Sequence, residues 1–190
     1  MINIKALVIT ASTRKQSNSV AATKLFIRTL KIKNAALTVK TIDINPLKIK
    51  PCTACLKCRE SYACVIKDDV SKILKHLATA TVVIIASPVY FMGAPAKLKA
   101  LIDRSEPAWF KYSKGMKKKW KNGAIILTAE ANNRSTFVGA KNEIKSFLAV
   151  NGIKTKTTVT LGTMQGENIF IQDKKAQRKI IKAAMEFAND

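Results

Sequence analysis

The sequence predicts an α/β protein, a three-layer α/β/α sandwich with a five-stranded parallel sheet between two layers of helices. Two observations carry this prediction. Apolar, β-rich runs alternate along the chain with segments of helical periodicity. The inner runs, Thr81–Ser87 and Gly123–Ala129, are continuously apolar, as is typical of parallel strands covered on both faces. The chain has 190 residues, 47% of them apolar, and lacks internal repeats or linkers, so we expect one domain over residues 1–190 with a cysteine-rich loop at 46–68.

The expected strands follow from β-branched apolar runs or from alternation of apolar and polar residues. In chain order they are Ile4–Thr10, Leu37–Ile44, Thr81–Ser87, Gly123–Ala129 and Ile153–Leu161. The expected helices carry apolar side chains at three- and four-residue spacing. They are Ser19–Lys31, Val70–Ala80, Ala96–Trp109, Thr136–Val150 and Asp173–Ala188.

Local signals support the boundaries of two of these helices. Asp68 and Asp69 precede the second helix as capping acids, and Asn151-Gly152 follows the fourth as a C-terminal cap. A parallel sheet of this kind binds ligands beyond the carboxyl ends of its strands. We therefore expect the functional loops after the first, third and fourth strands.

The chain is strongly basic, with 34 Lys and Arg against 12 Asp and Glu and a net charge of +22. Residues 1–95 carry 15 basic and 4 acidic groups and residues 96–190 carry 19 and 8, so each half contributes +11. The densest run extends from Lys111 to Lys121 and includes Lys114, Lys117, Lys118 and Lys119. This charge favours an anionic partner or reflects a solvated lysine-rich surface. No helix-turn-helix, RNA-binding or zinc-finger pattern is present, which argues against nucleic acid.

No apolar run approaches the roughly 20 residues that span a bilayer, and the start of the chain lacks a signal peptide pattern. We therefore expect no membrane partner and an intracellular, cytoplasmic location, with an organelle as the alternative suggested by the charge. Clustered cysteines in such a chain indicate a reducing compartment, where thiols serve metals or redox chemistry.

All four cysteines of the chain fall within thirteen residues, in the spacing C-x2-C-x2-C-x5-C: Cys52, Cys55, Cys58 and Cys64. Structural zinc sites usually pair two C-x2-C units across a longer spacer, so the compact run favours an iron–sulfur cluster held by four thiolates. Zinc, and cysteines that hold no metal, are the alternatives.

Two loops could hold a planar anionic ligand. The loop after the first strand places hydroxyls, backbone N–H groups and a cation at a helix N-terminus, which is an anion site. Its candidate residues are Ser12, Thr13, Arg14, Ser17, Asn18 and Ser19. The loop after the third strand forms an apolar, aromatic ledge suited to a flat ring. Its residues are Pro88, Val89, Tyr90, Phe91, Met92 and Gly93.

The loop after the fourth strand would form the opposite wall of the same crevice, with Ala131 and Asn132 as its candidate contacts. Its polar side chains suit hydrogen bonds to a ring or a ribityl chain. The only histidine, His76, lies within a predicted helix and is interpreted as structural. We nominate no catalytic side chain.

These motifs together resemble a known family. The segment from Ser12 to Ser19 resembles the phosphate loop of the NAD(P)H-dependent FMN reductases, Ser87–Phe91 resembles their S-P-V-Y-(F/W) flavin loop, and Lys97–Arg104 resembles the L-K-x-x-I-D-R stretch that follows. Pro51–Asp69 resembles the compact cysteine segment of the iron–sulfur flavoproteins in that superfamily. Two positions differ from the usual pattern, because Ala11 and Met92 stand where glycine is common.

The resemblance implies a flavodoxin-like fold, bound FMN, a [4Fe-4S] cluster on the four cysteines, and a homodimer or homotetramer in which the cluster of one subunit lies near the flavin of its neighbour. It implies a flavin-dependent oxidoreductase that exchanges electrons with NAD(P)H, a ferredoxin-like carrier or a small-molecule acceptor. A cluster-free FMN or quinone reductase is the alternative. An alternative of another class is a basic protein that binds nucleic acid or an anionic surface on the same scaffold.

Overall fold

The computed structural model describes residues 5–115 and 119–189. Ile4 of the first predicted strand, and Lys117 and Lys118 of the basic run, lie outside the described residues.

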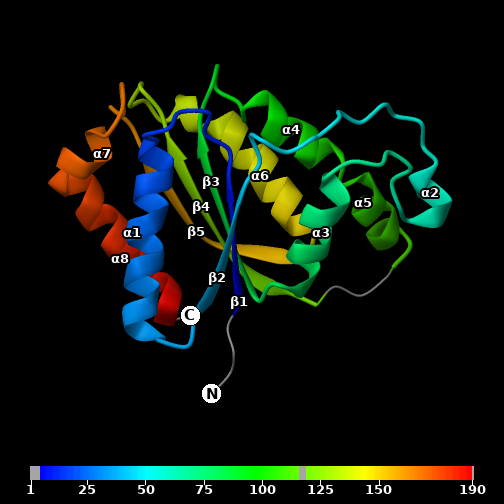
Figure 1. The fold of residues 1–190 in the computed structure, drawn as a ribbon, viewed down its shortest axis with the longest axis horizontal. Coiled ribbons are helices and arrows are strands. Elements are labelled where there is room, and N and C mark those ends of the chain that lie inside the picture. Colours follow the sequence, from blue (N-terminus) through cyan, green and yellow to red (C-terminus); the bar gives the residue numbers. More distant parts are fainter. Residues whose placement is uncertain (1–4, 116–118, 190) are drawn as a thin grey trace.

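The described residues contain a sheet of five parallel strands. These are β1 (Lys5–Thr10), β2 (Thr38–Asp43), β3 (Val82–Pro88), β4 (Lys121–Thr128) and β5 (Ile153–Leu161). Their order across the sheet is β2-β1-β3-β4-β5 (Figure 1). The chain moves outward from β1 to β2 and then returns to β3 on the other side of β1, so the topological switch point lies between β1 and β3. The predicted flavodoxin-like fold class is confirmed.

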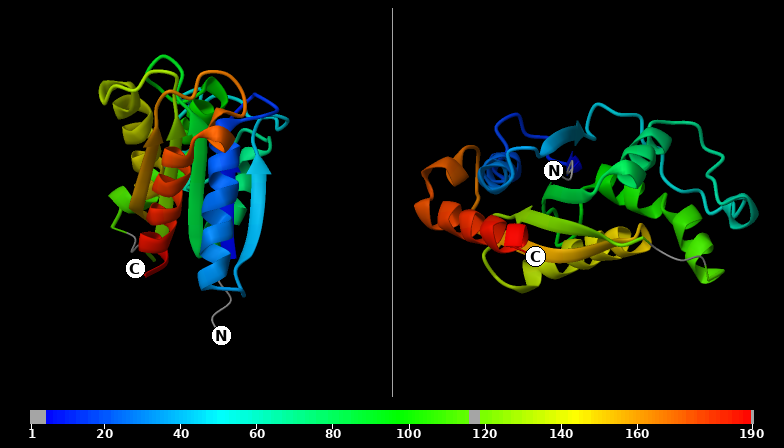
Figure 2. Two further views of the ribbon diagram at one scale, coloured as in Figure 1. Left: turned by 90° about the vertical axis from the view of Figure 1, so that its left-hand side faces the viewer. Right: turned by 90° about the horizontal axis from the view of Figure 1, so that it is seen from below.

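Alternate side chains of β1 enter two separate hydrophobic cores. Leu7 and Ile9 pack with α3 (Val70–Thr79), α4 (Ala96–Asp103) and α6 (Val138–Val150). Ala6 and Val8 pack with α1 (Asn18–Lys33) and α8 (Lys174–Asn189). Because strand side chains alternate between the two faces, this arrangement explains why the inner strands are apolar throughout. Figure 2 shows α1 and α8 side by side on one face of the sheet.

The predicted helix Ala96–Trp109 is two helices in the structure. α4 ends at Asp103, and α5 runs over Glu106–Ser113 after a turn at Arg104 and Ser105. Pro107 stands in the first turn of α5, where its missing N–H costs nothing; inside one continuous helix it would have removed a hydrogen bond and clashed with the preceding turn. The prediction of one helix was wrong, because Pro107 marks the start of a second helix.

Further short helical segments lie between these elements or at their ends. They are α2 (Cys58–Ser61), the 3-10 turn η1 (Ser135–Phe137) before α6, and α7 (Ile169–Gln172) before α8. In the described part of the chain no helix is long and apolar enough to cross a membrane. In Figure 1 the carboxyl ends of the strands point away from both labelled termini, and the predicted ligand loops gather at that edge.

Candidate functional site

A cavity of about 140 Å³ opens at the carboxyl edge of the sheet, beside the switch point. Loops after β1, β3, β4 and β5 form its wall. The lining residues are Ser12, Arg14, Ser17, Asn18, Pro88, Val89, Tyr90, Thr128, Ala129, Glu130, Met164 and Gln165. The structure thus brings together four of the six residues predicted in the β1–α1 loop and three of the six predicted in the β3–α4 loop.

The β1–α1 loop presents the N-terminus of α1 at this cavity. Ser17 is the N-cap, and its hydroxyl accepts a hydrogen bond from the Val20 N–H at 3.3 Å. The first N–H groups of a helix have no partner within the helix, and they carry partial positive charge. Ser19 is buried beneath the loop, with its hydroxyl 2.9 Å from that of Ser17, so it supports the cap rather than lining the cavity.

Sequence reasoning missed the loop after β5, which closes the same cavity. The buried Asn18 amide donates to the carbonyls of Met164 (3.2 Å) and Gly166 (3.0 Å) and accepts from the Phe170 N–H at 3.0 Å. The Arg14 guanidinium also donates to the Gly166 carbonyl, at 3.1 Å. The signal in the sequence was the segment GTMQG directly after the last strand, with a glycine at each end.

The β3–α4 loop ends in a tight turn. Tyr90 and Gly93 exchange both backbone hydrogen bonds, at 3.1 and 2.9 Å, around Phe91 and Met92. Both central residues have positive φ, 46° for Phe91 and 64° for Met92, as in a type I′ turn. This backbone costs non-glycine residues roughly 1–2 kcal/mol each. Phe91 is fully exposed, so packing in the monomer does not offset that cost.

Helix α6 holds the tip of this turn. The Ala140 N–H donates to the Met92 carbonyl at 3.1 Å, and the Glu143 carboxylate accepts from the Ala94 N–H at 2.9 Å. The close approach depends on Gly139, where an added Cβ would lie 2.3 Å from the Met92 carbonyl oxygen. The turn is therefore set by contacts from a helix about fifty residues further along the chain.

The remaining predicted residues lie near the cavity but outside its wall. The Thr13 hydroxyl is 3.5 Å from the Tyr90 hydroxyl. Ala131 follows the lining residue Glu130. Asn132 packs against Gly162 so closely that a Cβ there would lie 2.2 Å from the Asn132 side-chain oxygen. The three residues before Ala131 line the cavity, Thr128 at the end of β4 and Ala129 and Glu130 in the loop after it.

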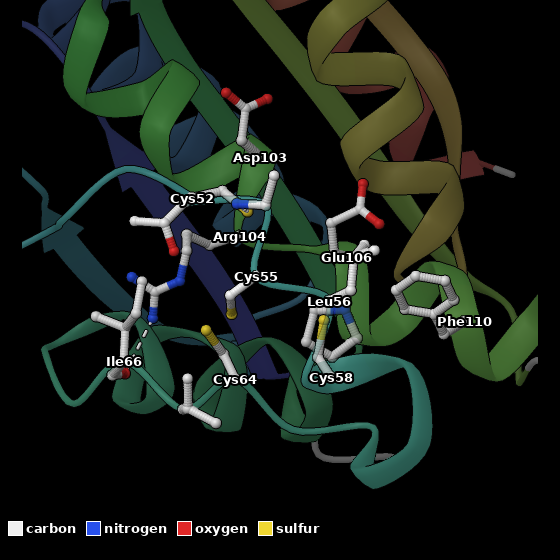
Figure 3. Close-up of a pocket in the computed structure, with 14 residues that line it drawn as sticks. Cys52, Cys55, Leu56, Cys58, Cys64, Ile66, Asp103, Arg104, Glu106 and Phe110 are labelled. Carbon is white, nitrogen blue, oxygen red and sulfur yellow. Dashed lines mark hydrogen bonds between the residues drawn. The ribbon is translucent and has the colours of Figure 1, made fainter.

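The four cysteines line a second cavity, of about 180 Å³, between their loop and α5 (Figure 3). All four thiols are free, and Cys58 is the most buried of them. Glu106, Pro107 and Phe110 of α5 form the facing wall. The turn between α4 and α5, which sequence reasoning missed, thus places α5 over the cysteine loop.

Backbone N–H groups in this loop turn toward the sulfurs. The Ala54 N–H donates to Cys52 Sγ at 3.4 Å, and a hydrogen bond from the backbone of Lys57 lowers the pKa of Cys55. Ala54 and Leu56 have positive φ values of 51° and 56°, which lets each C-x2-C turn fold back on its first cysteine. Hydrogen bonds to sulfur stabilise thiolates, the form that binds metals.

Burial raises the pKa of Cys58, and the neighbouring Cys64 and Cys52 raise it further. The sulfurs are therefore close enough to influence one another. Within residues 5–115 and 119–189, however, no three Cys, His, Asp or Glu side chains form a group that could hold a metal ion. A four-iron cluster is held by thiolates around its corners, so its sulfurs lie further apart than those around a single ion.

Arg104 closes one side of the cysteine cavity, and its side chain is 1% exposed. It forms a bidentate ion pair with Asp68, at 2.7 and 3.2 Å. It also donates to the carbonyls of Lys50 (3.0 Å) and Ile66 (3.1 Å). One arginine thus joins the two ends of the cysteine loop, which sequence reasoning did not foresee.

The ion pair keeps both partners charged. Burial opposes ionisation of Asp68, but hydrogen bonds from Arg104 and from the Lys50 and Val70 N–H groups outweigh it and lower the pKa of the carboxyl. Burial likewise opposes the charge on Arg104, yet Asp68 and the nearby Cys64 raise its pKa. Asp68 accepts a hydrogen bond from the Val70 N–H at the start of α3, while its main partner is Arg104. The N-cap residue is Asp69, whose side chain makes no capping hydrogen bond, so of the two predicted capping acids only Asp68 bonds to the first turn in this way.

Residues 4–165 match the NADPH-dependent FMN reductase family. An iron-sulfur flavoprotein from Archaeoglobus fulgidus is 29% identical over 86% of this chain and 71% of its own length. Iron-sulfur flavoproteins from Methanocaldococcus jannaschii and Methanosarcina thermophila are 35% and 37% identical, over 55% and 54% of this chain. These two alignments cover only about half of the relatives' lengths, 53% and 52%.

Solved structures share the fold. The NAD(P)H:quinone oxidoreductase from Methanothermobacter marburgensis has a TM-score of 0.74 at 17% identity, covering 98% of this chain and 96% of its own. An FMN-dependent NADH-azoreductase from Bacillus anthracis, solved in complex with FMN, has a TM-score of 0.71 at 19% identity, covering 97% and 100%. The chain is a flavin-dependent oxidoreductase. It belongs to the NADPH-dependent FMN reductase family.

Proposed function

We propose that this chain is an FMN-dependent redox enzyme that carries a [4Fe-4S] cluster and passes electrons between the flavin and an external carrier or small acceptor. The observation that carries the proposal is the cavity lined by all four cysteines in a chain of a flavin reductase family. The names of the archaeal relatives support the same reading.

In this proposal the FMN phosphate binds at the β1–α1 loop. The N-terminus of α1, the Ser12 and Ser17 hydroxyls and the Arg14 guanidinium converge on one cavity, and each favours an anion. Asn18 lines the same cavity, Ser19 supports the Ser17 cap, and the Thr13 hydroxyl lies beside that of Tyr90. Arg14 is exposed, and its Nη1 donates one hydrogen bond to the Gly166 carbonyl, so the other guanidinium N–H groups are available to a phosphate.

The isoalloxazine ring then rests on the β3–α4 loop. Pro88, Val89 and Tyr90 reach the same cavity, and the turn at Phe91–Gly93 extends the apolar surface beyond it. Ala131 and Asn132 would border the ring from the opposite side. A cavity of about 140 Å³ is smaller than a pocket that encloses a whole ligand, which suits a site that buries the phosphate end and leaves the ring edge open to an electron partner.

Cys52, Cys55, Cys58 and Cys64 would hold the cluster as thiolates. A bound cluster supplies one-electron chemistry, which complements the one- and two-electron chemistry of FMN. The chain contributes N–H donors to the sulfurs and a wall from Pro107 and Phe110 that limits water. No side chain is required as an acid or base in this scheme.

The partners follow from placement and charge. The two cavities are lined by different loops of the chain, and α2 in the cysteine loop lies far from α1 and α7 (Figure 1). Because the two sites of one subunit are separated, we propose a homodimer or homotetramer in which the cluster of a neighbouring subunit approaches the flavin. Exposed Lys57, Arg59 and Lys67 flank the cysteines and would attract an acidic ferredoxin-like carrier. NAD(P)H is the other proposed donor.

The test is anaerobic purification followed by iron, acid-labile sulfide and flavin assays. We expect FMN and four irons per chain. Each of Cys52→Ala, Cys55→Ala, Cys58→Ala and Cys64→Ala should remove or convert the cluster while FMN stays bound, because the flavin loops are separate. Glu60→Gln, in the same loop but outside the cavity wall, is the matched control and should keep its iron.

Each contrary result identifies an alternative. Flavin without iron in the anaerobic protein would replace the proposal with a cluster-free NAD(P)H-dependent FMN or quinone reductase. A colourless protein that retains nucleic acid would favour a basic protein that binds nucleic acid or an anionic surface, the alternative that the net charge of +22 suggests.

A further inference from the structure

A buried hydrogen-bond donor of Arg104 remains unused at the wall of the cysteine cavity. A guanidinium has five N–H donors. The four on Nη1 and Nη2 are directed to the Lys50 and Ile66 carbonyls and to both carboxylate oxygens of Asp68. Among the described residues, the Nε–H is buried and has no hydrogen-bond partner.

An unsatisfied buried donor is costly, typically by about 1–3 kcal/mol, and proteins rarely keep one without a reason. The side chain cannot rotate to satisfy it, because the other four donors fix the plane of the guanidinium. In Figure 3 the guanidinium lies beside the sulfur of Cys64, and Arg104 and Cys64 both line the cavity. The sulfur that this placement offers to the Nε–H is that of Cys64, whose interaction with the Arg104 side chain also raises the pKa of Arg104.

We propose that Arg104 is a positioning residue for the cluster: it clamps both ends of the cysteine loop, and its Nε–H donates a hydrogen bond to Cys64 or to a cluster sulfur once the cluster is bound. This inference rests on the proposed cluster. Hydrogen bonds to cluster sulfurs raise the reduction potential, because they stabilise the more negative reduced state.

The charges around the site agree with this role. Arg104 is paired with Asp68, so the pair adds little net charge, and the influence on the cluster comes mainly from the directed N–H. Asp103 and Glu106 also line the cavity; Asp103 is paired with Lys99 at 2.6 Å, so it is Glu106 that opposes negative charge on the sulfurs. A donor that faces the thiolates offsets this repulsion.

The first experiment compares wild type with Arg104→Lys, which keeps the cation but loses the planar fork and the Nε–H. Asp68→Asn is the matched control, because it breaks the ion pair and leaves the Nε–H in place. FMN retention and circular dichroism establish folding. We expect Arg104→Lys to lower the cluster midpoint potential and change its electron paramagnetic resonance spectrum, and Asp68→Asn, which leaves the Arg104 cation unpaired, to raise the potential instead. Equal potentials and spectra in wild type and Arg104→Lys would overturn the hydrogen bond.

A second measurement needs no substitution. Wild type labelled with ¹⁵N-arginine and reduced anaerobically should show a ¹⁵N hyperfine coupling to the cluster in pulsed electron paramagnetic resonance. Absence of that coupling would also overturn the hydrogen bond. Iron and sulfide assays on the same samples separate this failure from failure of the cluster proposal, which would show as wild type without iron.

The clamp is tested in iron-free protein. Trypsin can cut the loop at the exposed Lys57, Arg59 and Lys67. We expect Arg104→Lys to be cut at these sites several-fold faster than wild type, since fewer bonds then join Lys50 and Ile66. Equal cleavage rates would overturn the clamp.

Discussion

Gly139→Ala offers a sharp test of how the β3–α4 loop is held. The added Cβ would lie 2.3 Å from the Met92 carbonyl oxygen and 3.3 Å from its carbonyl carbon. Ordinary contact begins at 3.4 Å, so the loop tip or the start of α6 must move by about 1.1 Å, the difference between 3.4 and 2.3 Å. Both atoms are backbone, so no side-chain rotation relieves the clash.

The magnitude follows from three effects. Overpacking costs roughly 1–3 kcal/mol. A 1.1 Å shift also breaks the 3.1 Å bond from the Ala140 N–H to the Met92 carbonyl, which costs about 0.5–1.5 kcal/mol. Alanine is a better helix former than glycine by at most ~1 kcal/mol, which offsets only part of this. We expect a net loss of about 1–3 kcal/mol in the free energy of unfolding.

Urea denaturation of the flavin-free protein measures this loss, and FMN titration measures the consequence for the site. FMN should bind more weakly, because the displaced tip carries the Tyr90–Gly93 turn with it. Gly93→Ala is the matched control in the same loop: its Cβ would meet atoms at 3.8 and 3.9 Å, an ordinary contact, so stability should change by less than about 1 kcal/mol. If Gly139→Ala were as stable as Gly93→Ala, the docking of the loop on α6 would be refuted.

Three further outcomes are expected. Arg14→Ala should weaken FMN binding roughly 10–100-fold, which corresponds to the free energy of one charged hydrogen bond. Lys15→Ala removes the same charge from outside the cavity wall and should weaken binding much less. If FMN titration and retention after desalting gave the same loss for both variants, Arg14 would not be part of the site. Asp68→Asn should destabilise the protein by about 3–5 kcal/mol at pH 7, because it leaves the buried Arg104 unpaired. Folding lowers the pKa of Asp68, so the carboxylate contributes its full stabilisation at pH values above its pKa in the unfolded chain, near 4, and loses it as the pH falls through its pKa in the folded protein. The difference in free energy of unfolding between wild type and Asp68→Asn should therefore become smaller in acid. A difference that does not change with pH would contradict the ion pair. Tyr90→Ala should alter the absorbance spectrum of bound FMN, and an unchanged spectrum would place the ring elsewhere.

Much of the fold was predictable because its signals are local. A strand such as Val82–Pro88 is buried on both faces, so every residue must be apolar or small, and that pattern is visible without tertiary information. The β5 bounds, Ile153–Leu161, were predicted to the residue. The break between α4 and α5 also has a local signal, Pro107, which marks the first turn of α5.

The sites were predictable only in part. The spacing of the cysteines and the composition of the loops after the first and third strands identified candidate binding residues. This was possible because thiols, hydroxyls, cations and aromatic rings bind the same kinds of group in any fold. The lining by Met164 and Gln165 could not be found in this way, because their loop reaches the cavity through Asn18, 146 residues away from Met164.

By itself the sequence determined the kind of protein: the order of strands and helices, the edge of the sheet that carries the predicted ligand loops, and the four thiols of one loop. The tertiary structure decided how these parts are held. The Met92 turn depends on a glycine in α6, and the cysteine loop depends on Arg104, whose partners lie 36 to 54 residues away in the chain. Periodicity and spacing record what each segment does alone, whereas buried hydrogen bonds and close backbone contacts exist only once distant segments have packed together.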